Sequence, residues 1–100
     1  MSRGDLSWLW DVLAERKHAD PEDSYTARLL EAGPARVARK LGEEAAETII
    51  AGIAASYGES KQALVEESAD LLYHLLVFLL ASEVDLADVI GELERRHRER

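Results

Sequence analysis

The apolar positions of this chain recur at helical spacing and nowhere alternate as they would in a half-buried strand. Five stretches show this spacing, at residues 5–17, 25–32, 34–57, 61–82 and 86–98. Their boundaries carry capping residues (Ser24, Ser60, Asp85) and helix stops (Gly33, Gly58). The pattern predicts an all-α fold, a bundle of about five helices centred on an antiparallel hairpin of the third and fourth.

The third and fourth stretches differ in how much of their surface is apolar. The third carries one stripe that we expect to face inward: Val37, Leu41, Ala45, Thr48 or Ile49, and Gly52 or Ile53. The fourth is apolar nearly all round over residues 71–80, which is more surface than so short a chain can cover alone. The simplest partner is a second copy, so we expect homodimerisation to complete the bundle.

Two pairs of carboxylates stand where these two helices change from polar to apolar. Glu44 and Glu47 form one pair, and Glu67 and Asp70 form the other, each at the i, i+3 spacing that shares a helix face. Each helical residue adds about 1.5 Å of rise. Counted up the third helix to the turn and back down the fourth, this rise places both pairs at similar heights on the hairpin. Two facing pairs predict a site for a hard divalent cation such as Mg²⁺.

Other interpretations of the polar residues remain. Each carboxylate alone is also compatible with a solvated helix surface, and Lys40 is placed to pair with Glu44. A different kind of metal site uses Glu-x-x-His pairs, and the chain has two of them, Glu15/His18 and Glu94/His97. Both lie at basic helix ends, out of register with an apolar stripe, so we discount them. Trp8 and Trp10 lie off the first stripe and suit either packing or stacking on a base.

Charge and composition narrow the possible partners. The formal net charge is −8, from 20 acidic and 12 basic side chains, which argues against a nucleic-acid partner. Residues 41–94 hold twelve of the acids and one base, Lys61, so the acidity is concentrated around the carboxylate pairs. The absence of cysteine excludes disulfides, thiolate zinc sites and a cysteine nucleophile.

The sequence gives no sign of a membrane protein. Its first residues lack the apolar segment of a secretory signal, and its longest apolar run, at 71–81, is too short to span a bilayer. We therefore expect a cytoplasmic protein that forms a single domain over residues 1–100.

Three segments give the chain a resemblance to a known family. They read Ser24-Tyr-Thr-Ala-Arg28-Leu, Arg39-Lys-Leu-Gly-Glu-Glu-Ala-Ala-Glu47 and Glu67-Ser-Ala-Asp-Leu-Leu-Tyr-His74. The acidic residues within them resemble the metal-binding signature of the all-α nucleoside triphosphate pyrophosphatase superfamily. Within it, the chain is similar to the phosphoribosyl-ATP pyrophosphatases of histidine biosynthesis. The tryptophan-rich first helix and the arginine-rich tail are departures that concern local packing.

The resemblance implies hydrolysis of phosphoribosyl-ATP to phosphoribosyl-AMP and pyrophosphate, the second step of histidine synthesis. It also implies Mg²⁺ dependence and a dimer built around the central helices. On this interpretation the metal ligands are the two i, i+3 pairs, Glu44, Glu47, Glu67 and Asp70. The catalytic set adds Glu43, as a second-metal ligand or as a base that orients the attacking water.

A polyanionic substrate also needs cationic contacts near an acidic site. The natural phosphate contacts are the basic residues just upstream of the carboxylates, Lys40, Arg39 and Arg28. Arg36 is equally well a solvated surface charge. Ser24 and Tyr25 are hydroxyl contacts or, alternatively, a helix cap and a core residue. His74 is either a substrate contact or a hydrogen-bonded core histidine.

Two other functions are compatible with the sequence. A housekeeping pyrophosphatase of the same superfamily would share the metal site but cleave ordinary or damaged nucleoside triphosphates. A non-enzymatic acidic helical protein would bind partners through residues 71–80 and would show no thermal shift with Mg²⁺.

Overall fold

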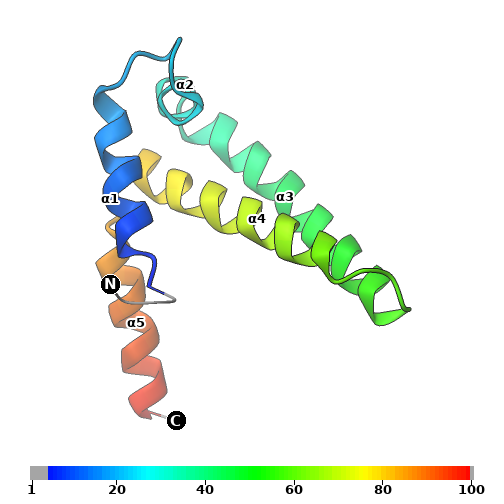
Figure 1. The fold of residues 1–100 in the computed structure, drawn as a ribbon. Helices are drawn as coiled ribbons and strands as arrows, with labels where there is room; N and C mark the ends of the chain where they lie inside the picture. Colours follow the sequence, from blue (N-terminus) through cyan, green and yellow to red (C-terminus); the bar gives the residue numbers. More distant parts are fainter. Residues whose placement is uncertain (1–4, 100) are drawn as a thin grey trace.

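The computed structural model describes residues 5–99, and these form helices joined by short connections, with no strand among them (Figure 1). The elements are α1 (Ser7–Glu15), the short 3₁₀ helix η1 (Arg16–His18), α2 (Tyr25–Ala32), α3 (Pro34–Ser56), α4 (Gln62–Ala81) and α5 (Leu86–Glu99). The all-α fold with five α-helices is therefore confirmed. None of the described helices is both long and apolar enough to cross a membrane.

Most local signals in the sequence mark the helix ends correctly, but Ser60 lies one residue before the N-cap of α4, which is Lys61. The Ser24 hydroxyl accepts a hydrogen bond of 3.1 Å from the amide of Ala27 and so caps α2. Gly33 ends α2 at a φ of 97°, a backbone conformation that a side chain would strain, and Pro34 starts α3 without a missing hydrogen bond. The Asp85 carboxylate accepts from the amide of Ala87 at the start of α5.

The α3–α4 hairpin is the central element of the molecule. Figure 1 shows the two helices side by side, with α1, α2 and α5 gathered at the end where α3 begins and α4 ends. Thr48 of α3 ties the pair together, because its hydroxyl lies 2.8 Å from the Glu44 carbonyl oxygen and 3.1 Å from the Glu67 carbonyl oxygen. The hairpin is thereby fixed at the height of the predicted carboxylate site.

The hydrophobic core lies at the end of the hairpin where α3 begins and α4 ends. It is formed by buried side chains from five helices, Leu13, Leu29, Val37, Leu76, Val77, Leu80 and Leu86. Trp10 packs against this cluster, whereas Trp8 is 58% exposed. Three of the core residues come from the apolar run 71–80, so much of that run is buried within its own chain.

The predicted inward stripe of α3 passes through Thr48 and Gly52, which are half-buried, and not through their alternatives Ile49 and Ile53. Ile49 and Ile53 are 65% and 57% exposed, while Glu44 and Ala51 are buried. The reason is the rotation of α3 about its axis, which turns the line of Glu44, Thr48 and Ala51 toward α4. Polar groups occupy part of the inner face, and the isoleucines are displaced outward.

The unpartnered apolar surface lies in the distal half of the hairpin. The most exposed apolar side chains there are Ile49, Ile50, Ile53, Tyr57 and Val65, each more than half exposed. In this region the hairpin is only two helices thick, because α1, α2 and α5 cover the other end (Figure 1). The excess apolar surface expected from the sequence is thus present, but mainly outside residues 71–80.

Candidate metal centre

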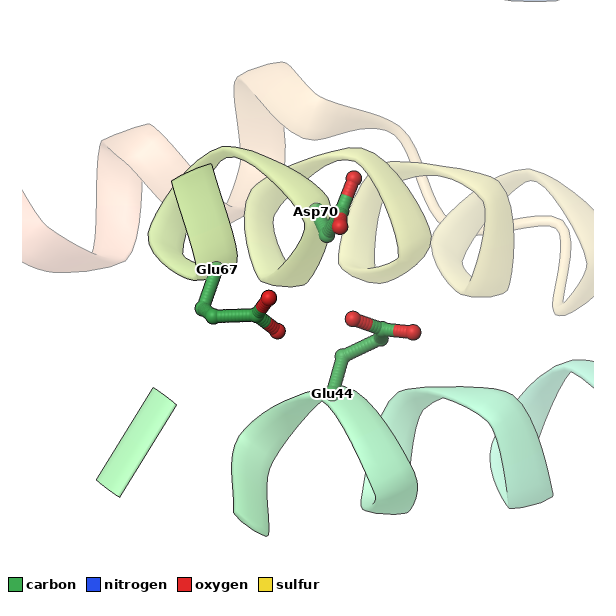
Figure 2. Close-up of side chains that lie close together, drawn as sticks. All are labelled: Glu44, Glu67 and Asp70. Carbon is green, nitrogen blue, oxygen red and sulfur yellow. The ribbon is translucent and has the colours of Figure 1, made fainter. Parts of the chain in front are cut away.

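Three carboxylates converge between α3 and α4. Figure 2 shows Glu44 of α3 and Glu67 of α4 directed into the space between the two helices, with Asp70 beside them on α4. Each offers an oxygen atom, and these three oxygens lie within 4.8 Å of one another. The i, i+3 spacing places Glu67 and Asp70 one turn apart on α4, and the antiparallel return of the hairpin places Glu44 opposite them.

Glu44 is buried, Glu67 is half-buried and Asp70 is exposed, and two oxygens of the first two residues are left unsatisfied. Glu44 is only 6% exposed, and its Oε2 atom has no hydrogen-bond partner in the described part of the chain. The same holds for Oε2 of Glu67. A buried carboxylate oxygen without a partner costs free energy, which a bound cation would offset. The residues present therefore fit a hard divalent cation that prefers oxygen ligands.

Glu47 lies against this cluster rather than within it. The pKa of Glu67 is raised, first because the Glu47 carboxyl group lies close enough to favour a proton between them, and then because Glu67 is partly desolvated. The negative charges of Glu47, Glu44 and Asp70 raise that pKa further. Four carboxyl groups thus share one electrostatic environment, although only three of them bring oxygens within 4.8 Å of one another.

Lys40 is the cation next to the cluster. Its Nζ atom lies 3.7 Å from Oε1 of Glu44 and 3.7 Å from Oε1 of Glu43, one turn along α3. The pKa of Lys40 is raised, chiefly by the neighbouring Tyr25 phenol and, against the effect of partial desolvation, by the Glu43 and Glu44 carboxylates. Lys40 is therefore protonated at neutral pH and pairs with one oxygen of Glu44, while the other oxygen stays unpaired.

A basic groove of about 440 Å³ begins at Lys40. It is lined by residues from α2 and the first half of α3, Tyr25, Leu29, Arg36, Arg39, Lys40 and Glu43. The sequence predicted Arg39 and Lys40 as phosphate contacts, and the structure places both on this groove. Arg28 lies further along α2, where its guanidinium donates to the Pro21 carbonyl oxygen at 2.9 Å and covers the Tyr25 ring at 5.7 Å.

His74 connects the cluster to this groove. It is 5% exposed, and its Nδ1 atom lies 2.8 Å from the Asp70 carbonyl oxygen. Because a carbonyl oxygen can only accept, Nδ1 carries a proton, and in the neutral ring Nε2 is an acceptor. Nε2 lies 3.1 Å from the Tyr25 hydroxyl, which therefore donates to it. Both nitrogens of His74 are thus occupied by the protein.

Sequence reasoning missed a second link between α2 and α4. Thr26 is hydrogen-bonded to the Tyr73 hydroxyl, and the Tyr73 ring stacks on that of Tyr25 with centroids 6.2 Å apart. It also missed Thr48, which bridges the backbones of α3 and α4 and was assigned only to an apolar stripe. Hydroxyls within apolar runs were the available signal, since a buried hydroxyl needs a partner.

Carboxylates facing one another across a helical hairpin, with a basic groove beside them, define a site suited to a divalent cation and a phosphate-bearing ligand. The chain belongs to the phosphoribosyl-ATP pyrophosphohydrolase family, whose model matches residues 6–97, and it is accordingly an enzyme of the hydrolase class. The resemblance noted in the sequence is thereby confirmed.

Curated relatives agree with this assignment. The phosphoribosyl-ATP pyrophosphatase of Rhizobium meliloti (strain 1021) is 54% identical over 91 residues, which cover 91% of this chain and 81% of the relative. That of Agrobacterium fabrum is 50% identical over 96% of this chain and 86% of the relative. The chain also matches 40% of the histidine biosynthesis bifunctional protein HisIE of Xylella fastidiosa (strain Temecula1), at 49% identity.

Proposed function

We propose that this protein hydrolyses phosphoribosyl-ATP to phosphoribosyl-AMP and pyrophosphate in a Mg²⁺-dependent reaction, the second step of histidine biosynthesis. The observation that carries the proposal is the pair of buried, unpartnered carboxylate oxygens on Glu44 and Glu67, in a chain of this family. An acidic site repels a triphosphate unless a cation neutralises it, so carboxylates and substrate together call for Mg²⁺.

The proposed metal ligands are Glu44, Glu67 and Asp70, with Glu47 at their edge. Mg²⁺ bound here would neutralise charge on the leaving pyrophosphate and orient the phosphate oxygens. Three carboxylates with oxygens within 4.8 Å can supply part of its shell and leave positions for substrate and water. Glu47 is exposed and raises the pKa of the neighbouring Glu67, so it serves either as a further ligand or as support for Glu67.

The remaining catalytic roles fall to residues of α2 and α3. Glu43 is half exposed beside Lys40, where it can accept a proton from the attacking water or bind a second cation. Lys40 and Arg39 line the groove that leads from the carboxylates, and we assign them to the phosphates of the substrate. No covalent nucleophile is needed, because positioning and charge neutralisation lower the barrier of this reaction.

Tyr25 and His74 take different roles in this proposal. Tyr25 is 41% exposed and borders the groove, so its ring and hydroxyl are available to the substrate. His74 is buried with both nitrogens bonded, and we assign it to holding the Tyr25 hydroxyl in place rather than to a substrate contact. Arg28 lies over the Tyr25 ring, beside the groove.

We also propose that two copies associate through the distal half of the α3–α4 hairpin. Ile49, Ile53 and Val65 form an exposed apolar surface on both helices, and a second copy of the hairpin would complete a four-helix arrangement. The cytoplasmic location and the organisation of residues 1–100 as one domain stay predictions from the sequence.

The test is a comparison of substrates with the purified protein. Phosphoribosyl-ATP, ATP, dCTP and dUTP are each incubated with and without Mg²⁺, and pyrophosphate and the nucleoside monophosphate are measured. Preference for phosphoribosyl-ATP, lost when Mg²⁺ is removed, supports the proposal. Preference for an ordinary triphosphate would favour the housekeeping pyrophosphatase. The family assignment already excludes the non-enzymatic alternative.

A further inference from the structure

A second groove adjoins the first on the side away from the carboxylates. It has a volume of about 320 Å³ and lies between the outer face of α2 and the start of α3. The two grooves share Tyr25, Leu29 and Arg36, so they form one continuous surface depression. Arg36 lies about 12 Å before Glu44 along α3, at about 1.5 Å per residue. The second groove is therefore remote from the candidate metal centre but connected to it.

The charges of the second groove are two arginines and one glutamate. Arg28 uses one of its five N–H donors on the Pro21 carbonyl oxygen and is held over the Tyr25 ring, which leaves other donors free. Arg36 forms neither an ion pair nor a hydrogen bond within residues 5–99, although the chain has 20 acidic side chains. Two guanidinium groups with unused donors suit a phosphate group.

The carboxylate of Glu31 distinguishes this groove from a simple anion site. It lines the groove together with Arg28 and Arg36. A carboxylate repels phosphate but accepts hydrogen bonds from sugar hydroxyls, as acidic residues do for the ribose of dinucleotides. Arginines with a nearby carboxylate therefore match a sugar phosphate, which carries an anionic end and a polyhydroxyl ring, better than they match pyrophosphate or a triphosphate.

We propose that this second groove binds the phosphoribosyl group of the substrate, with its phosphate on Arg28 and Arg36 and its hydroxyls on Glu31. The inference rests on the proposed function, because phosphoribosyl-ATP carries a phosphate at each end whereas ATP carries phosphates at one end only. The carboxylate cluster and Lys40 hold the triphosphate end. Arg28 and Arg36 then determine specificity, since they contact the part of the substrate that ATP lacks.

This assignment predicts a particular kinetic effect. The phosphoribosyl phosphate takes no part in bond breaking, so its contacts contribute equally to the ground state and the transition state. Loss of one arginine should raise KM for phosphoribosyl-ATP at least about tenfold, with a smaller change in kcat. This pattern is expected when the lost contact binds the substrate and the transition state equally well. Loss of a metal ligand should instead lower kcat.

The experiment compares Arg36→Met, Arg28→Met and a matched control, Arg98→Met, which removes the same charge from the exposed end of α5. KM and kcat for phosphoribosyl-ATP are measured for each. Arg36→Met is the primary variant, because Arg28 also binds the Pro21 carbonyl oxygen and its loss can disturb the fold. A KM for Arg36→Met within twofold of that for Arg98→Met would overturn the assignment.

Inhibition by ribose 5-phosphate provides a second readout. We expect it to inhibit the unaltered protein, to bind at the same time as magnesium pyrophosphate, and to lose potency in Arg36→Met but not in Arg98→Met. Mutually exclusive binding with pyrophosphate, or no inhibition, would overturn the second groove. If the unaltered protein releases no pyrophosphate from phosphoribosyl-ATP, the proposed function fails and this inference fails with it. If it releases pyrophosphate but Arg36→Met behaves like Arg98→Met, only this inference fails.

Discussion

Glu44 of α3 and Glu67 of α4 bring carboxylate oxygens within 4.8 Å of each other across the hairpin, and one oxygen of each is buried without a partner. Lys40 neutralises Glu44 only in part, at 3.7 Å and from one side. This arrangement destabilises the cation-free protein, because like charges repel each other and lack solvation. The hairpin is thereby prepared for a divalent cation, which would remove both costs.

Replacement of Glu67 should make the cation-free protein more stable. Glu67→Gln keeps the shape of the side chain but removes one negative charge from beside Glu44, Glu47 and Asp70, so the melting temperature without metal should rise by a few degrees. The added stabilisation by Mg²⁺ should disappear, since it depends on binding to the folded state. Thermal unfolding with and without Mg²⁺ measures both effects. Glu66→Gln, on the exposed side of α4, is the matched control and should behave like the unaltered protein.

The pH dependence of stability should report the same repulsion. The pKa of Glu67 in the folded protein is raised above its ordinary value of 4.5, so the folded state holds this proton to higher pH than the unfolded chain. Without metal, Glu67 therefore contributes stability below pH 4.5 that is lost as the pH rises through the raised value. Glu92, whose pKa is lowered by Arg95 and Arg96, acts in the opposite direction.

The contribution of Glu67 is isolated by subtracting urea unfolding free energies of Glu67→Gln from those of the unaltered protein at each pH. As the pH rises above 4.5, the unfolding free energy of the unaltered protein should fall relative to that of Glu67→Gln. Saturating Mg²⁺ should abolish this trend. A difference that is constant across this range without metal would show that Glu67 titrates as an ordinary surface carboxyl.

Tyr25 and His74 should be energetically coupled. Tyr25→Phe leaves Nε2 of the buried His74 without its donor, so it should destabilise the protein by about 1–3 kcal/mol. In His74→Phe the hydroxyl has already lost its acceptor, and adding Tyr25→Phe should cost less. A double-mutant cycle by urea unfolding measures the coupling, with Tyr57→Phe, at an 86% exposed residue, as the control. Additivity of the two changes within about 0.5 kcal/mol would contradict the assigned hydrogen bond.

The distal surface of the hairpin should control self-association. Ile53→Lys places a charge in the proposed contact and should convert a dimer to a monomer in sedimentation experiments. Leu93→Lys on α5 alters a residue of similar exposure, 59% against 57%, outside the proposed contact, and should leave the dimer intact. A monomeric unaltered protein at micromolar concentration would contradict the proposed dimer.

The sequence predicted the helices and much of the site because both depend on local spacing. Capping residues and glycines determine the helix ends, and an i, i+3 pair shares a helix face whatever the tertiary structure. The height match of the two carboxylate pairs followed from helical rise alone, and the structure brings three of the four residues together, Glu44, Glu67 and Asp70.

Other features depend on the rotation of one helix against another, which hydrophobic periodicity does not determine when apolar residues surround a helix. The sequence therefore left Ile49 and Ile53 as alternatives to Thr48 and Gly52 on the inner face, and the structure exposes both isoleucines. The link from Tyr25 to His74 joins residues 49 positions apart and depends on how α2 docks against α4. Such contacts have no signature in local spacing.

The most direct test of the central claim is the Mg²⁺ dependence of pyrophosphate release from phosphoribosyl-ATP in Asp70→Ala and Glu47→Ala, with Glu66→Ala as the control. If the carboxylate cluster holds the cation on which hydrolysis depends, kcat should fall at least about 100-fold in Asp70→Ala and the Mg²⁺ concentration for half activity should rise. Glu66→Ala should match the unaltered protein. Mg²⁺-dependent release that stays intact in both Asp70→Ala and Glu47→Ala would contradict the assignment of the metal site.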